Sequence, residues 1–114
     1  MSDFEDVGAV SDVAEGEMHG VTLHDGEPVC VFNYRGSIGA VGNLCTHSAF
    51  LISDGVLHGD GTLECVWHGA RFDCRTGAVR RQPAVDPLPV YEVRTDQGRV
   101  LVGPRTNAIT EQPQ

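Results

Sequence analysis

The chain has 114 residues, of which 40% are hydrophobic, with 14 Gly, 6 Pro and a net charge of −8. This length suits one small domain, and the frequent Gly and Pro favour short strands joined by tight turns over a helical bundle. The negative charge argues against partners such as nucleic acid or an anionic membrane, and no apolar run reaches the roughly 18 residues of a membrane span.

The charge is unevenly distributed along the chain. Residues 1–34 contain eight acidic residues and no cationic one, and all eight cationic residues of the chain are Arg. An acidic surface is compatible with steering toward a basic protein partner, and equally with simple solubility. The acidic N-terminus is neither a secretory signal nor a transit peptide, so we expect a cytoplasmic protein. In that compartment four Cys favour metal ligation over disulfide bonds.

Strand-forming segments alternate with turn residues along the whole chain, which predicts an all-β fold. Asp60-Gly61 between two such segments is a strong hairpin signal, and Asp96-Gln97-Gly98 marks a final hairpin. One helical turn is expected over residues 13–17, capped by Ser11 or Asp12. The expected strands cover residues 4–10, 18–23, 28–34, 37–41, 56–58, 62–66, 91–95 and 99–102.

The C-terminal third contains a proline-rich segment, residues 82–89, which cannot be a central strand. We expect it to be a stiff surface loop, either a plain connector or a rigid flap over the site described next. The domain is expected to span residues 1–103, with a flexible polar tail over residues 104–114.

Four metal-ligand residues form two short pairs, Cys45-Thr46-His47 and Cys65-Val66-Trp67-His68, separated by seventeen residues. Each pair is short enough for one loop to direct both side chains at one point. Two thiolates and two imidazoles suit zinc or an iron–sulfur cluster, and residue identity alone leaves both open. Zinc sites usually draw both Cys from one loop, whereas one Cys and one His from each loop fits a two-iron cluster with mixed ligation.

These pairs resemble those of Rieske-type ferredoxins, the small electron carriers of bacterial aromatic-ring dioxygenase systems. The resemblance extends from about Phe4 to Val102, and the two ligand pairs are its most specific part. Supporting motifs are Ser53-Asp54-Gly55, Phe72-Asp73, Thr76-Gly77, Pro83-Ala84 and Pro87-Leu88.

The resemblance implies a Rieske fold, in which antiparallel sheets form a basal domain with a small inserted cluster-binding subdomain, here about residues 43–75. It implies one [2Fe–2S] cluster, with Cys45 and Cys65 on one iron and His47 and His68 on the other. The implied partners are a flavoprotein ferredoxin reductase and a terminal ring-hydroxylating oxygenase. A monomeric carrier that is not itself an enzyme is expected.

Departures from respiratory Rieske proteins indicate a low potential. Those proteins have a disulfide between their ligand loops, but Phe50 and Trp67 occupy the matching positions here. The positions that donate hydrogen bonds to the cluster sulfurs are Ala70 and Phe72, whose side chains cannot donate. Fewer donors stabilise the reduced cluster less, which places the expected potential near the low end of the Rieske range, about −150 mV.

The remaining chemistry-bearing residues have mostly structural interpretations. Cys30 and Cys74 are expected to pack in the core, and Trp67 to shield the cluster or to contact a partner. The isolated His19, His24 and His58 are expected to be surface polar residues. The Arg-rich stretch comprises Arg71, Arg75, Arg80 and Arg81, and it either docks a partner or is simply solvated.

Three other functions remain open from the sequence. They are a zinc-stapled binding module, a Rieske accessory protein of iron–sulfur assembly, and the small subunit of a nitrite reductase. Iron and acid-labile sulfide in the purified protein would separate the first from the others.

Overall fold

The computed structural model describes residues 4–44, 50–66, 69–81 and 87–106. These residues form two antiparallel sheets, a larger one with strand order β1-β10-β9-β4-β3-β2 and a smaller one with order β5-β6-β7-β8. The strands are β1 (Glu5–Ala9), β2 (Met18–Thr22), β3 (Pro28–Tyr34), β4 (Ser37–Gly42), β5 (Val56–Leu57), β6 (Thr62–Glu64), β7 (Arg71–Asp73), β8 (Val79–Arg81), β9 (Val90–Asp96) and β10 (Arg99–Arg105). The all-β prediction is confirmed.

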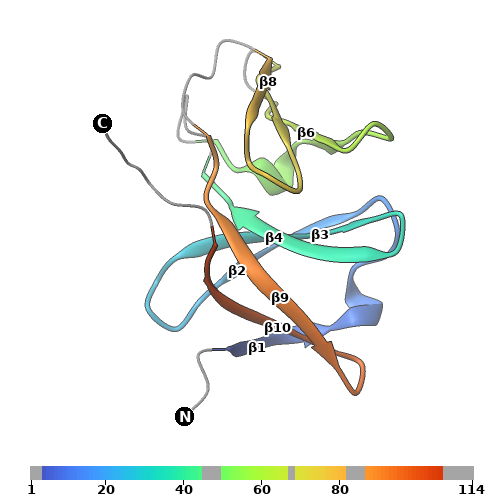
Figure 1. Ribbon diagram of the computed structural model, residues 1–114, viewed down its shortest axis with the longest axis vertical. Helices are drawn as coiled ribbons and strands as arrows, with labels where there is room; N and C mark the ends of the chain where they lie inside the picture. The colour runs from blue at the N-terminus through green and yellow to red at the C-terminus, as the bar shows by residue number, and fades with distance from the viewer. Residues whose placement is uncertain (1–3, 45–49, 67–68, 82–86, 107–114) are drawn as a thin grey trace.

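The smaller sheet is an insertion between β4 and β9 of the larger one. It lies at one end of the molecule in Figure 1, with β1 at the opposite end. This is the predicted arrangement of a basal domain and an inserted subdomain. No helix in the described part of the chain is both long enough and apolar enough to cross a membrane.

Strand β3 is buried on both of its faces. The alternation seen in the sequence directs Cys30 and Phe32 into a core cluster that also contains side chains of the smaller sheet. Val29 and Val31 point into a second cluster within the larger sheet. The two faces of one strand therefore join the subdomain to the basal domain.

Two hairpin turns use backbone conformations that most residues avoid. Arg35 and Gly36 have φ angles of 54° and 89°, and Gln97 and Gly98 have φ angles of 50° and 78°. Positive φ at both central residues is the requirement of the type I′ turn, whose twist matches that of the flanking strands. The predicted Asp60-Gly61 turn is also confirmed, and the Asp60 carboxylate accepts a hydrogen bond from the Thr62 amide at 3.1 Å.

Three local expectations were wrong. The helical turn lies at Val10–Asp12, earlier than predicted, because Asp12 accepts a hydrogen bond from the Ala9 amide. Strands β7 and β8 were not predicted, since each has three residues and their alternation is too short to detect. Strand β10 continues to Arg105, beyond the predicted end at Val102.

Candidate metal centre

Both predicted ligand loops are closed at their bases by backbone pairing. Leu44 and Leu51 form an isolated antiparallel bridge on either side of the first loop. The Cys65 amide donates to the Ala70 carbonyl at 2.8 Å and closes the second loop. Such closure joins the base of each loop to the neighbouring strands, and metal sites need a rigid scaffold of this kind.

Of the four predicted ligands, the structure describes Cys65. It directly follows β6, is fully buried and is not in a disulfide. It belongs to the same core cluster as Ala70 and Phe72. The thiol therefore packs against apolar side chains of the described residues, and neither Ala70 nor Phe72 has a side chain that can donate a hydrogen bond to it.

The other three predicted ligands, Cys45, His47 and His68, lie outside the described residues, as does Trp67. Residues 82–86 of the proline-rich segment also lie outside them, but its end is described. There Leu88 is fully buried in the core rather than on the surface.

Two further thiols have the packing roles expected of them. Cys30 and Cys74 are buried in the core cluster and neither is in a disulfide. Burial raises the pKa of Cys30 to about 12 and also raises the pKa of Cys74. Their burial among apolar side chains agrees with a role in packing.

The segment after the first loop is held against β6 by a glycine. An added Cβ at Gly55 would overlap the backbone carbonyl oxygen of Glu64, the residue before Cys65. The Ser53-Asp54-Gly55 motif is thereby explained, because only Gly lets the two backbones approach this closely. Gly77 has an equivalent role with a φ of 75°, because an added Cβ there would overlap the Leu88 carbonyl.

Sequence reasoning missed a buried amide next to the first loop. Asn43 is 3% exposed, and its Oδ1 accepts from the Ser53 amide at 2.8 Å while its Nδ2 donates to Ser53 Oγ at 3.0 Å. The Ile52 amide also donates to the Asn43 carbonyl at 2.7 Å. The only signal in the sequence was a single Asn at the end of a strand, and Asn is also common in turns, so this position did not indicate a buried amide.

His58 is not the free surface residue that was expected. Its Nε2 lies 2.5 Å from Glu64 Oε1, and both side chains are less than a third exposed. The hydrogen bond from His58, opposed by desolvation and aided by the charge of Arg71, holds the pKa of Glu64 below its usual value. His19 and His24 are exposed as expected, although His24 pairs with Glu5 at 2.7 Å.

The Arg-rich stretch is not simply solvated. Arg71 lies 3.4 Å from Glu64, Arg80 lies 2.9 Å from Asp73, and the Arg75 guanidinium lies 5.9 Å from the centre of the Tyr34 ring. Many of these Arg side chains therefore interact with other groups of the protein itself, which leaves fewer of them for a partner.

Large apolar side chains flank the ligand loops and face the solvent. We call them the loop-flanking residues: Leu44 (48% exposed), Phe50 (42%), Leu51 (37%) and Val66 (55%). Exposed apolar groups gathered at one site of a small protein indicate an interaction surface. Phe50 also confirms that no Cys is available at this position for a bridge between the loops.

The donor chemistry fits a Rieske cluster better than a zinc site. The buried Cys65 directly follows β6, and both loops are closed at their bases. In the sequence, each loop contains one Cys and one His. Mixed thiolate and imidazole ligation of this kind is characteristic of the Rieske centre.

Comparison with known proteins agrees with this assignment. The family model described as the Rieske [2Fe-2S] domain matches residues 3–92. The ferredoxin component of the naphthalene 1,2-dioxygenase system of Pseudomonas putida is 37% identical over 94 residues, which cover 82% of this chain and 88% of that protein.

Two solved structures have the same fold. The ferredoxin of carbazole 1,9a-dioxygenase from Nocardioides aromaticivorans IC177 superposes with a TM-score of 0.85 at 34% identity, over 90% of this chain and 99% of that one. A complex of reduced oxygenase and oxidised ferredoxin in carbazole 1,9a-dioxygenase contains a chain that matches with a TM-score of 0.84 at 31% identity, over 90% of this chain and 94% of that one. With its ligand-pair spacing, its inserted four-stranded sheet and its buried Cys65, the chain belongs to the Rieske [2Fe–2S] family.

Proposed function

We propose that the chain carries single electrons from an NAD(P)H-dependent ferredoxin reductase to a terminal Rieske non-haem iron aromatic-ring dioxygenase. Its relatives are ferredoxin components of dioxygenase systems, which are electron carriers and not the catalytic components. The observation that carries the proposal is the 37% identity to a dioxygenase ferredoxin across 82% of the chain. The carbazole complex supports the oxygenase as the downstream partner.

The chain holds one Rieske-type [2Fe–2S] cluster, in keeping with its family. We assign Cys45 and Cys65 to one iron and His47 and His68 to the other. When bound, this group supplies a one-electron couple. The contribution of the chain is to close the bases of the two loops, through the Leu44–Leu51 bridge and the Cys65–Ala70 hydrogen bond.

The loop-flanking residues are proposed as the surface that meets both partners. A carrier must dock and release quickly, so its interface should be small, below roughly 1,200 Å² in total. Exposed apolar side chains at such a surface lose water on contact and bring the loops close to the partner without strong ion pairs.

Replacing Leu44 and Val66 by Ser should therefore weaken docking, and a midpoint potential equal to that of the parent protein would show that the redox centre is intact. Removing two exposed apolar side chains should cost about 1 kcal/mol of binding, or about fivefold in the rate of oxygenase reduction at limiting carrier concentration. The measurement is stopped-flow reduction of the oxygenase by the pre-reduced carrier. Val56→Ser is the matched control, because Val56 is 50% exposed but lies on β5. An equal loss in the control would contradict the assignment of the surface.

The midpoint potential should lie near the low end of the Rieske range, at about −150 mV. The reason is that Ala70 and Phe72 lack side-chain donors, so the reduced state gains little from hydrogen bonds. Spectroelectrochemical titration of the purified protein measures this value directly. A midpoint above zero would contradict the argument.

Reconstitution tests the function as a whole. The purified chain, a flavoprotein reductase, NADH and a ring-hydroxylating oxygenase should together oxidise an aromatic substrate, and omission of the chain should stop the reaction. A brown protein that accepts electrons from no such reductase would favour one of the other two Rieske functions, assembly accessory protein or nitrite reductase subunit. The relatives described above do not favour either of these, nor the zinc-stapled module.

The carrier is proposed to act as a cytoplasmic monomer without a nucleic-acid or membrane partner. Its domain is proposed to span residues 1–103, although β10 itself continues to Arg105 and the Thr106 amide still donates to the Val90 carbonyl at 2.7 Å.

A further inference from the structure

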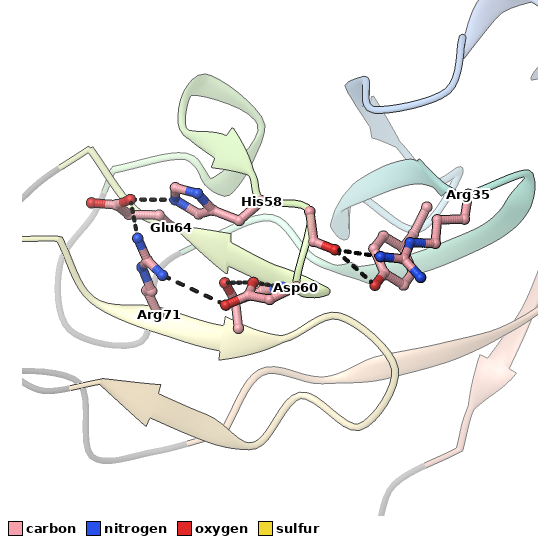
Figure 2. A network of polar contacts seen from close by, with 8 residues as sticks. Arg35, His58, Asp60, Glu64 and Arg71 are labelled. Carbon is pink, nitrogen blue, oxygen red and sulfur yellow. Dashed lines mark hydrogen bonds and ion pairs between the residues drawn. The ribbon is translucent and has the colours of Figure 1, made fainter.

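A network of charged side chains lies directly beside the second ligand loop (Figure 2). Its centre is Glu64, the residue before Cys65, whose Oε1 lies 2.5 Å from His58 Nε2 and 3.4 Å from Arg71 Nη2. Arg71 also reaches back to Asp60, with 3.8 Å between Nη1 and Oδ2. Glu64 and Arg71 are paired residues of β6 and β7, so the sheet itself holds them together.

The other oxygen of the Glu64 carboxylate lies near Gly69 of the ligand loop. Gly69 has a φ of 72°, and an added Cβ there would lie 3.1 Å from Glu64 Oε2. The loop between Cys65 and Ala70 is thus closed by its own backbone hydrogen bond, and the Glu64 carboxylate lies near Gly69 at its end. A change in the charge or position of Glu64 is therefore expected to change the electrostatic potential at Cys65, the next residue in the chain.

Arg71 is held where water screens it poorly. Its side chain is 27% exposed, and its Nε is buried without a hydrogen-bond acceptor among the residues that the structure describes. A guanidinium fixed in this way retains much of its electrostatic effect on neighbouring groups.

The network also connects to the basal sheet. The Gly59 carbonyl accepts hydrogen bonds from Tyr34 Oη and Arg35 Nη2, both at 3.1 Å. In Figure 2 Arg35 reaches the β5–β6 hairpin from the opposite side to Glu64 and Arg71. The hairpin that bears His58 and Asp60 is therefore anchored at its tip as well as along its strands.

From this arrangement we propose that Glu64 and Arg71 are a positioning pair that sets the midpoint potential of the centre through their opposite charges beside the Cys65 loop. Reduction adds one electron and hence one negative charge to the centre. A fixed cation nearby stabilises the reduced state and a fixed anion destabilises it. With both present the two effects largely offset each other, and the potential depends on the balance between them.

Three variants test the pair by titration of the midpoint potential in the holoprotein. Arg71→Gln should lower the reduced-to-oxidised ratio at a fixed applied potential by a few-fold to about tenfold, and tenfold corresponds to 59 mV for one electron. Glu64→Gln should shift the ratio in the opposite direction. The double variant should return close to the parent value, because it removes both charges.

Arg80→Gln is the matched control, since Arg80 pairs with Asp73 at 2.9 Å in the same sheet but farther along β7 from the loop. It should leave the potential unchanged. If both single variants shift the potential in the same direction, or neither shifts it, the proposal is overturned. A purely structural role would instead speed cluster loss in every variant, including the double one, which absorbance decay in the presence of an iron chelator would reveal.

The inference rests on the proposed ligation by Cys65. The two can fail separately. A Cys65 variant that keeps its cluster would contradict the assignment of Cys65 as a ligand. Unshifted potentials in Glu64 and Arg71 variants with a full cluster would contradict only the role of the pair.

Discussion

Replacement of Cys65 by Ala is expected to abolish the [2Fe–2S] cluster, with loss of visible absorbance, of iron and of acid-labile sulfide. Cys65 is buried directly after β6, and neither of the other described thiols, Cys30 and Cys74, lies in the loop between Cys65 and Ala70, where it could replace Cys65 as a ligand. Without one of its two thiolates the cluster has an open position that a methyl group cannot fill. Iron and sulfide analysis of the purified variant, with the electron paramagnetic resonance spectrum after dithionite, is the measurement.

The matched control is Cys74→Ala, which also removes a buried thiol from the same core cluster. Its thiol has a raised pKa caused mainly by burial, and it is assigned to packing. The variant should keep a full complement of iron and lose about 1 kcal/mol of stability, the size of an average core change. Loss of the cluster in this variant alone would reverse the assignment of the two thiols.

Gly55→Ala should be the most damaging substitution that leaves every proposed ligand in place. The new methyl group would overlap the Glu64 carbonyl oxygen, so the segment after the first loop would have to move away from β6. Overpacking of a backbone contact is expected to cost about 3 kcal/mol or more. Because Glu64 directly precedes Cys65, we also expect faster cluster loss. Thermal unfolding and iron content, measured on the same sample, test both effects.

Gly59→Ala is the control for this experiment. Gly59 lies in the same subdomain, but an added Cβ there has no described atom within 4 Å, and its φ is not positive. Its carbonyl, which accepts hydrogen bonds from Tyr34 and Arg35, is unchanged by the substitution. The free energy of unfolding should change by no more than it does for a surface substitution, within about 0.5 kcal/mol. Equal destabilisation by both variants would mean that the contact with Glu64 is not the cause.

Most of the basal domain could be predicted from local pattern. Seven-residue strands such as β3 show clear alternation, and the turns at Arg35-Gly36 and Gln97-Gly98 are marked by Gly at the positions that need positive φ. The smaller sheet was predicted only in part. The three-residue strands β7 and β8 are stabilised by their neighbours across the sheet and have too little periodicity of their own.

The candidate site divides in a similar way. Residue type and spacing alone indicated four ligands and a mixed pair in each loop, because ligation depends on the chemistry of the donors and on the length of chain between them. Burial then supported packing roles for Cys30 and Cys74. The supporting residues, Asn43 and His58, were missed or misjudged, since their partners are distant in the sequence or on another strand.

The fold class, the candidate ligand pairs and the lack of side-chain donors at Ala70 and Phe72 could thus be inferred from the sequence alone. These follow from local pattern and from side-chain chemistry, which need no partner to be recognised. The folded structure was needed to show that Gly55 must be Gly, that Arg71 is paired with Glu64 beside the Cys65 loop, and that the hairpin at Gly59 is anchored to the basal sheet. Each of these is a contact between two segments, and its energy depends on where both segments lie once the chain has folded.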